Sequence, residues 1–264
     1  MAVEKMSSLP FTPSRIKQRT SDKIIFIVCE GSVTEWEYFE NVVNSAFEKV
    51  KSKIKVINIL EDALRKPAKR RTTTEAKLVS SSHPLNLVNK MDEFKRDNEN
   101  VYDFTTHSED EFWLIMDVDD HTDPTIIDKE QKSNLDKWNE AITACKKRSY
   151  SYAVSNPFFE LWLLLHHDKV NTNPDDENND AKWAVTANHA YEPTDHFKER
   201  LSALGVGLHD KKHIKTEHYN KEKVLVAMGR AKELDTEPPV DYPTDLGTTV
   251  YRLLKKIEEI DSQY

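Results

Sequence analysis

The sequence has little glycine and little cysteine, and both shortages exclude classes of protein. Only 5 of its 264 residues are glycine, and none of them forms a Gly-rich loop of the kind that cradles nucleotide phosphates. We therefore do not expect the chain to be an ATPase by itself. The two cysteines, Cys29 and Cys145, lie far apart and in no metal-ligand spacing. A disulfide framework or structural zinc is not expected, and a reducing, cytoplasmic location fits.

Long hydrophobic runs and a positive net charge are also missing. No segment approaches the roughly 20 apolar residues that span a bilayer, and residues 1–22 hold no run of the kind that a signal peptide needs. The net charge of −8 argues against a wholly basic, nucleic-acid-coating surface but permits a local basic patch. We expect a globular protein without membrane contact, whose polar residues 1–22 form a flexible arm.

Apolar runs alternate with helical patterns along the rest of the chain. The runs predict four strands, and apolar residues at helical spacing predict a helix after each of them and further helices towards the end of the chain. The strands are expected at 24–29, 53–60, 111–117 and 149–155, and the main helices at 31–50, 84–97, 132–147, 157–167, 193–204, 217–234 and 245–260. This order favours an α/β fold with a doubly wound, mainly parallel four-stranded sheet flanked by helices. We divide the chain into the arm, an α/β domain at 23–168 and a helical part at 169–264 packed on it.

Acidic side chains follow two of the predicted strands. Glu30 ends the first strand, and Asp117 and Asp119 end the third. The carboxyl ends of parallel strands share one edge of a sheet, so these carboxylates should converge there. Ionised carboxylates repel one another unless a pKa rises or a divalent cation lies among them, and Mg²⁺ (or Mn²⁺) suits such a set. The alternative is that Asp117 to Asp123 form a solvated turn. Asp120 would be a ligand only if the loop turns there.

Two further acids are candidates for a second metal ion or for supporting the first. Glu35 has the S-x-x-E spacing from Ser32 that is typical of a capping box, and we favour the helix cap over a metal role. Glu160 lies among apolar residues, so it should either reach the acidic rim or pair with a lysine or arginine. Asn156, just before Pro157, is expected to cap the helix that follows.

A basic stretch interrupts the otherwise acidic sequence. "RKPAKRR" places five positive charges in seven residues, and the polar sequence after it suggests a loop between the second strand and the second helix. Such a loop opens at the same sheet edge as Glu30 and could hold a phosphate backbone against a metal ion. A solvated surface without a ligand is the alternative. The nucleic-acid-binding candidates are Arg65, Lys66, Lys69, Arg70 and Arg71.

These motifs carry a resemblance to known families. A strand ending "IVCEG" and a later strand ending "IMDVDD" resemble the Toprim domain of topoisomerases, primases and some nucleases. In the order "IVCEGSVTEWEYF", "WLIMDVDDH" and "SNPFFELWLLLH", the chain is similar to the RloB family of bacterial restriction-modification and abortive-infection loci. The first resemblance implies that Glu30 is a general acid or base and that Asp117 and Asp119 hold Mg²⁺ during phosphodiester cleavage. The second implies a role in anti-phage defence and a partner ATPase encoded nearby.

Two other functions remain open from the sequence. "MDVDDHT" also looks like the nucleophile motif of haloacid-dehalogenase-like phosphatases, in which Asp117 attacks phosphorus and Asp119 donates the proton. That class usually has its motif on the first strand, whereas here it is on the third. The chain could also be a non-catalytic module that docks onto a defence ATPase. The sequence does not choose between DNA and RNA, tRNA included, and leaves the trigger and oligomeric state open.

Overall fold

The computed structural model describes residues 23–31, 33–57, 83–186, 195–207, 213–235 and 241–264. Within these ranges a single five-stranded sheet forms the centre of the molecule. Its strands are β1 (Ile25–Cys29), β2 (Ile54–Ile57), β3 (Glu111–Asp117), β4 (Ser151–Asn156) and β5 (Gly247–Thr248). The four strands expected from the sequence are confirmed. The fifth lies at the start of what the sequence pattern suggested was one helix.

The strand order is β2-β1-β3-β4-β5, and the first four strands run parallel. Cys29 pairs with Ile115, and Asp117 pairs with Ser155. The short β5 is antiparallel to β4 and brings the C-terminal part of the chain into the sheet. The carboxyl ends of β1, β3 and β4 therefore lie at one edge, as the prediction for a parallel sheet requires.

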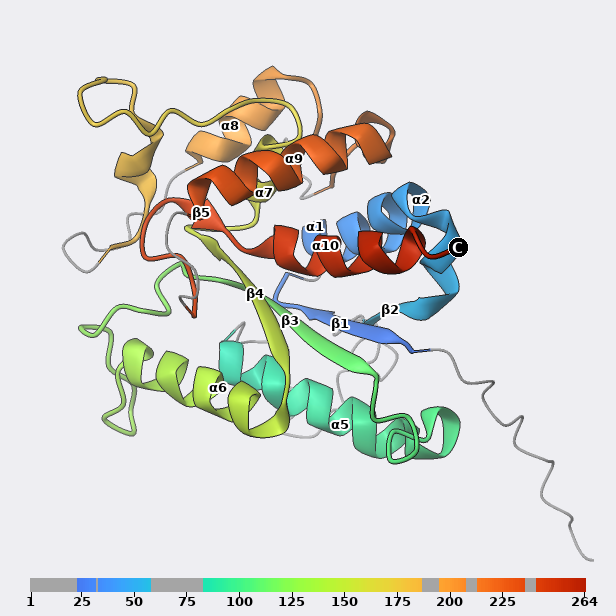
Figure 1. Ribbon diagram of the computed structural model, residues 1–264. Helices are drawn as coiled ribbons and strands as arrows, with labels where there is room; N and C mark the ends of the chain where they lie inside the picture. Colours follow the sequence, from blue (N-terminus) through green and yellow to red (C-terminus); the bar gives the residue numbers. More distant parts are fainter. Residues whose placement is uncertain (1–22, 32, 58–82, 187–194, 208–212, 236–240) are drawn as a thin grey trace, which may run out of the picture.

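Helices cover both faces of the sheet (Figure 1). α5 (Pro84–Tyr102) and α6 (Asn134–Arg148) lie on one face. α1 (Thr34–Glu37), α2 (Asn44–Ala46) and α10 (Val250–Asp261) lie on the other. Alternate residues of β1 face two separate cores, Ile25 and Ile27 on one side and Phe26 and Val28 on the other. Burial on both faces explains why this strand is continuously apolar.

The C-terminal helices share the core on one face of the sheet. α8 (His196–Ala203), α9 (Lys221–Leu234) and α10 contribute Phe197, Val224 and Leu253, which are fully buried in the same cluster as Ile25. In the described part of the chain, no helix has the length and apolar character needed to cross a membrane.

Two local expectations differ from the structure. The helix after β1 is interrupted by a π-helical segment, Tyr38–Val43, between α1 and α2. Asn156 is the last residue of β4 and not a helix cap: its side chain accepts a hydrogen bond from the Val185 N–H and donates to the carbonyl oxygens of Val185 and Pro243. It ties two later segments to the sheet edge, and α7 (Glu160–Leu164) begins only after it.

Candidate active site

Glu30 and Asp117 meet at the carboxyl edge of neighbouring strands. Glu30 follows β1 directly, and Asp117 is the last residue of β3. The backbone N–H of Asp117 donates to Glu30 Oε2 at 3.1 Å, while the Glu30 N–H donates to the Ile115 carbonyl oxygen at 3.0 Å. The register of β1 against β3 thus fixes the position of Glu30 beside the acidic motif that the sequence singles out.

Asp119 enters the site because the chain turns sharply after β3. The Val118 N–H still donates to the Ser155 carbonyl oxygen at 2.9 Å, and the Asp119 N–H donates to that of Pro157 at 3.1 Å. Asp119 has a φ of 39°, in the left-handed region that Asp tolerates better than most residues. This turn places the Asp119 charge near Glu30, Asp117 and Glu160, whose pKa values it helps to raise.

Glu35 and Glu160 also face this edge. The side chain of Glu35 folds back over Gly31, so closely that a Cβ at position 31 would collide with its carboxylate. This contact explains why glycine follows Glu30. Ser32, the expected capping partner of Glu35, lies outside the described residues. Glu160 begins α7, and its Oε1 lies 3.9 Å from Lys198 Nζ, so it both joins the acidic rim and has a basic partner.

Five acids thus lie close enough at the sheet edge to affect one another's pKa values, and we call them the carboxylate cluster: Glu30, Glu35, Asp117, Asp119 and Glu160. Withdrawal from solvent raises the pKa of Asp117 well above its ordinary value, and the charges of Glu35 and Glu30 raise it further. Burial, with repulsion from Glu160, raises the pKa of Glu35 to about 8. Burial likewise raises the pKa of Glu160, although the positive charge of Lys198 offsets part of this rise.

The cluster has the chemical character of a cation site. Asp117 Oδ1 is shielded from solvent and has no hydrogen-bond partner among the residues that the structure describes, which is costly for a carboxylate. Carboxylate oxygens are the ligands that Mg²⁺ prefers, and a divalent ion would reverse the repulsion that raises these pKa values. In their present side-chain positions, no three His, Cys, Asp or Glu residues of the described chain form a ligand set for a metal ion. Glu30, Asp117 and Asp119 fit such an ion by chemistry and would have to reorient to share it.

A histidine that sequence analysis did not assign to the site contacts Glu30 directly. His121 Nε2 lies 2.6 Å from Glu30 Oε1, and the histidine is buried against Trp138, with the two rings stacked. Burial disfavours the charged imidazole, but the hydrogen bond and charge of Glu30 prevail and raise the pKa of His121. The same partner limits the rise that burial produces in the pKa of Glu30. The available signal was the position of His121, directly after the acidic motif.

Asp120 lies at the margin of the site. Its Oδ1 is 3.6 Å from His121 Nδ1, and its side chain is 43% exposed. It is not among the main charges that raise the pKa values of Asp117 and Glu30. The basic stretch from Arg65 to Arg71 lies outside the described residues, so its expected position at the sheet edge stays a prediction.

Comparison with known proteins identifies the family. The family model for RloB-like proteins matches residues 25–257, from β1 to α10. The chain therefore belongs to the RloB-like family. Neither the curated proteins nor the solved structures contain a match to it.

Proposed function

We propose that this RloB-like protein is a Mg²⁺-dependent nuclease of the Toprim type, able to use Mn²⁺ as well, that cleaves phosphodiester bonds of DNA or RNA, tRNA included. We further propose that it is a toxic effector in anti-phage defence, controlled by a partner ATPase. The observation that carries the proposal is the carboxylate cluster at the carboxyl edge of a mainly parallel sheet, in which Asp117 Oδ1 has no hydrogen-bond partner within the described ranges. Ligands of open α/β sheets bind at this edge.

The residues divide into distinct roles in this proposal. Asp117 and Asp119 hold the ion, which when bound neutralises the charge that develops on the phosphate. Glu30 moves a proton at the reacting oxygen, a role that its raised pKa favours. His121 keeps the Glu30 carboxylate in one orientation through the 2.6 Å contact. Glu35 and Glu160 complete the negative site and are available for a second ion.

The position of the motif argues against the phosphatase alternative. A phosphatase of the haloacid dehalogenase class would use Asp117 as its nucleophile. In that class the motif usually follows the first strand of the domain, whereas Asp117 ends β3, and β1 and β2 precede it in the chain. Trapping of phosphate or beryllofluoride on Asp117 would revive that alternative. Metal-dependent cleavage of nucleic acid without a phosphorylated intermediate would end it.

The direct test is incubation of the purified protein with tRNA and with plasmid DNA, in Mg²⁺, in Mn²⁺ and in EDTA. We expect cleavage of one substrate class in either metal, no cleavage in EDTA, and loss of cleavage in Asp117→Ala and Glu30→Gln. Asp97→Asn, which changes an exposed acid on α5, is the matched control and should cleave like the wild type. Cleavage that survives both site substitutions would contradict the assignment.

The defence role needs a separate experiment in cells. Bacteria that carry the gene and its neighbours should lose phage protection on Asp117→Ala, while the variant still folds and still copurifies with the ATPase. Protection that persists in this variant would favour a non-catalytic docking module instead.

A further inference from the structure

The first helix described after residue 186, α8, is anchored beside the carboxylate cluster by two apolar side chains. Phe197 and Leu201 are fully buried. The ring of Phe197 packs edge-on against Phe158, two residues before Glu160, with 5.9 Å between the ring centroids. These contacts fix α8 against the segment that leads from β4 into the site.

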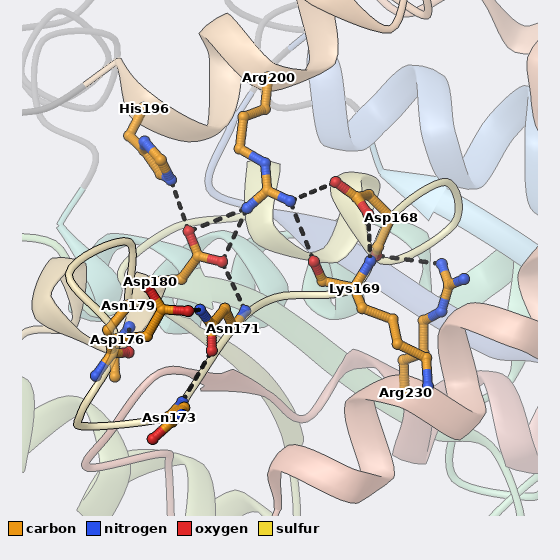
Figure 2. Close-up of polar contacts among 11 residues, drawn as sticks. Asp168, Lys169, Asn171, Asn173, Asp176, Asn179, Asp180, His196, Arg200 and Arg230 are labelled. Atoms are coloured by element: carbon orange, nitrogen blue, oxygen red, sulfur yellow. Dashed lines mark hydrogen bonds and ion pairs between the residues drawn. The ribbon is translucent and has the colours of Figure 1, made fainter.

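A polar network on another side of α8 restrains its rotation (Figure 2). Arg200 Nη1 donates to both carboxylate oxygens of Asp180, at 3.0 and 2.9 Å, and Arg200 Nη2 donates to Asp168 and to the Lys169 carbonyl oxygen. His196 Nε2, one turn earlier on α8, lies 2.8 Å from Asp180 Oδ1. Asp180 is only 4% exposed, so its charge is balanced by this clamp. The helix is thereby held in one orientation.

That orientation directs Lys198 towards the cluster. Lys198 Nζ lies 3.9 Å from Glu160 Oε1 and 3.6 Å from Asp195 Oδ1. Both distances exceed that of a direct hydrogen bond, and 43% of the lysine side chain is exposed to solvent. The ammonium group is thus a cation at the acidic rim that can exchange its carboxylate partners for another anion.

We propose that Lys198 is a phosphate-binding residue of the site, and that its ammonium group turns from Glu160 to a non-bridging oxygen of the bound nucleic-acid backbone. This inference rests on the proposed function and adds a residue from the C-terminal part of the chain to it. A phosphodiester that approaches five carboxylates is repelled, so positive charge beyond that of a metal ion favours its binding. Lysine is well suited to this role because it acts as a mobile point charge with three donors.

The test measures binding and cleavage in the full-length protein for Lys198→Gln, Lys198→Arg and the control Lys255→Gln. Lys255 forms a Lys–Glu pair of the same 3.9 Å length, with Glu259 on α10. Binding of fluorescently labelled tRNA and of labelled plasmid fragments is titrated in EDTA at several salt concentrations. We expect Lys198→Gln to weaken binding about threefold to tenfold and to make the slope of log K against log[salt] less negative by about 0.7–0.9, the loss of one phosphate contact.

Lys198→Arg should restore most of the binding, and Lys255→Gln should leave affinity and slope unchanged. Equal urea midpoints for wild type and Lys198→Gln would exclude a folding defect as the cause. A Lys198→Gln slope equal to that of the wild type would overturn the inference, whether or not the protein cleaves nucleic acid. If the salt slopes of wild type and Lys198→Gln differ as predicted while the wild type cleaves neither substrate, the phosphate contact stands and the nuclease proposal fails.

Discussion

His121 holds Glu30 at the edge of the sheet, with 2.6 Å between Nε2 of the histidine and Oε1 of the glutamate. The other Glu30 oxygen accepts the N–H of Asp117, so each carboxylate oxygen has one partner on the segment that ends β3. Glu30, which the sequence motif singles out, therefore depends on His121, which the sequence analysis did not assign to the site. The orientation of the proposed general acid or base is set by a buried imidazole.

Removing the imidazole should destabilise the protein. His121→Ala leaves Glu30 Oε1 withdrawn from solvent without a partner, and we expect a loss of about 1–3 kcal/mol in the free energy of unfolding. His121→Gln keeps an N–H donor and should lose less. The measurement is urea unfolding followed by tryptophan fluorescence. His107→Ala, which removes a buried histidine paired with the more exposed Glu109, is the control and should cost less than His121→Ala. If His121→Ala and His107→Ala lost equal free energy of unfolding, the contact between His121 and Glu30 would contribute no more than an ordinary histidine–glutamate pair.

Neutralising Asp117 should have the opposite effect on stability. In metal-free protein at neutral pH, folding must either bury the Asp117 charge or bind a proton to this carboxyl, because burial and its neighbours raise its pKa. Asp117→Asn removes that cost, so it should raise the free energy of unfolding by about 1–2 kcal/mol. The same change removes a proposed metal ligand, so stabilisation by Mg²⁺ should disappear. Thermal and urea unfolding in EDTA and in Mg²⁺ test both parts. If metal-free Asp117→Asn were less stable than the metal-free wild type, the Asp117 carboxyl would not destabilise the folded protein and the prediction would be wrong.

Glu35 should make the metal-free protein less stable as the pH rises. Its pKa of about 8 in the folded protein exceeds the ordinary value of 4.5, so the folded state holds a proton that the unfolded state has released. The contribution of Glu35 to stability is therefore fully present below pH 4.5 and is lost as the pH rises through about 8. Glu35→Gln should flatten this decline between pH 5 and 8, about the window that the two pKa values define. Unfolding free energies at pH 5, 6.5 and 8 give the slopes, and identical slopes in the two proteins would refute the prediction.

The fold was largely predictable because its signals are local. The continuous apolar run of β1 indicates a strand that is buried on both faces. The helical spacing of Leu87, Val88 and Met91 predicted α5. β5 was missed because two residues carry no periodicity, and its strand state depends on pairing with Ser155 and Asn156. Asn156 was wrongly expected to be a cap because its partners, Val185 and Pro243, lie far along the chain.

The candidate site was predictable where topology alone decides the position. The rule that parallel strands share a carboxyl edge was enough to bring Glu30, Asp117 and Asp119 together. It could not show which way a side chain turns, so the fold of Glu35 over Gly31 and the contact of His121 with Glu30 came only with the structure. Lys198 was missed for a related reason, since its place at the rim depends on how Arg200 and Phe197 hold α8.

In the function that we propose, the carboxylate cluster uses a divalent cation to cleave a phosphodiester. The most direct measurement is the single-turnover cleavage rate of the preferred nucleic acid, titrated with Mg²⁺, in wild type and Asp117→Asn. We expect a rate that rises with Mg²⁺, saturates and vanishes in EDTA for the wild type, and a drop of at least about a hundredfold in the variant. Cleavage without Mg²⁺, or an Asp117→Asn rate equal to that of the wild type, would contradict the account.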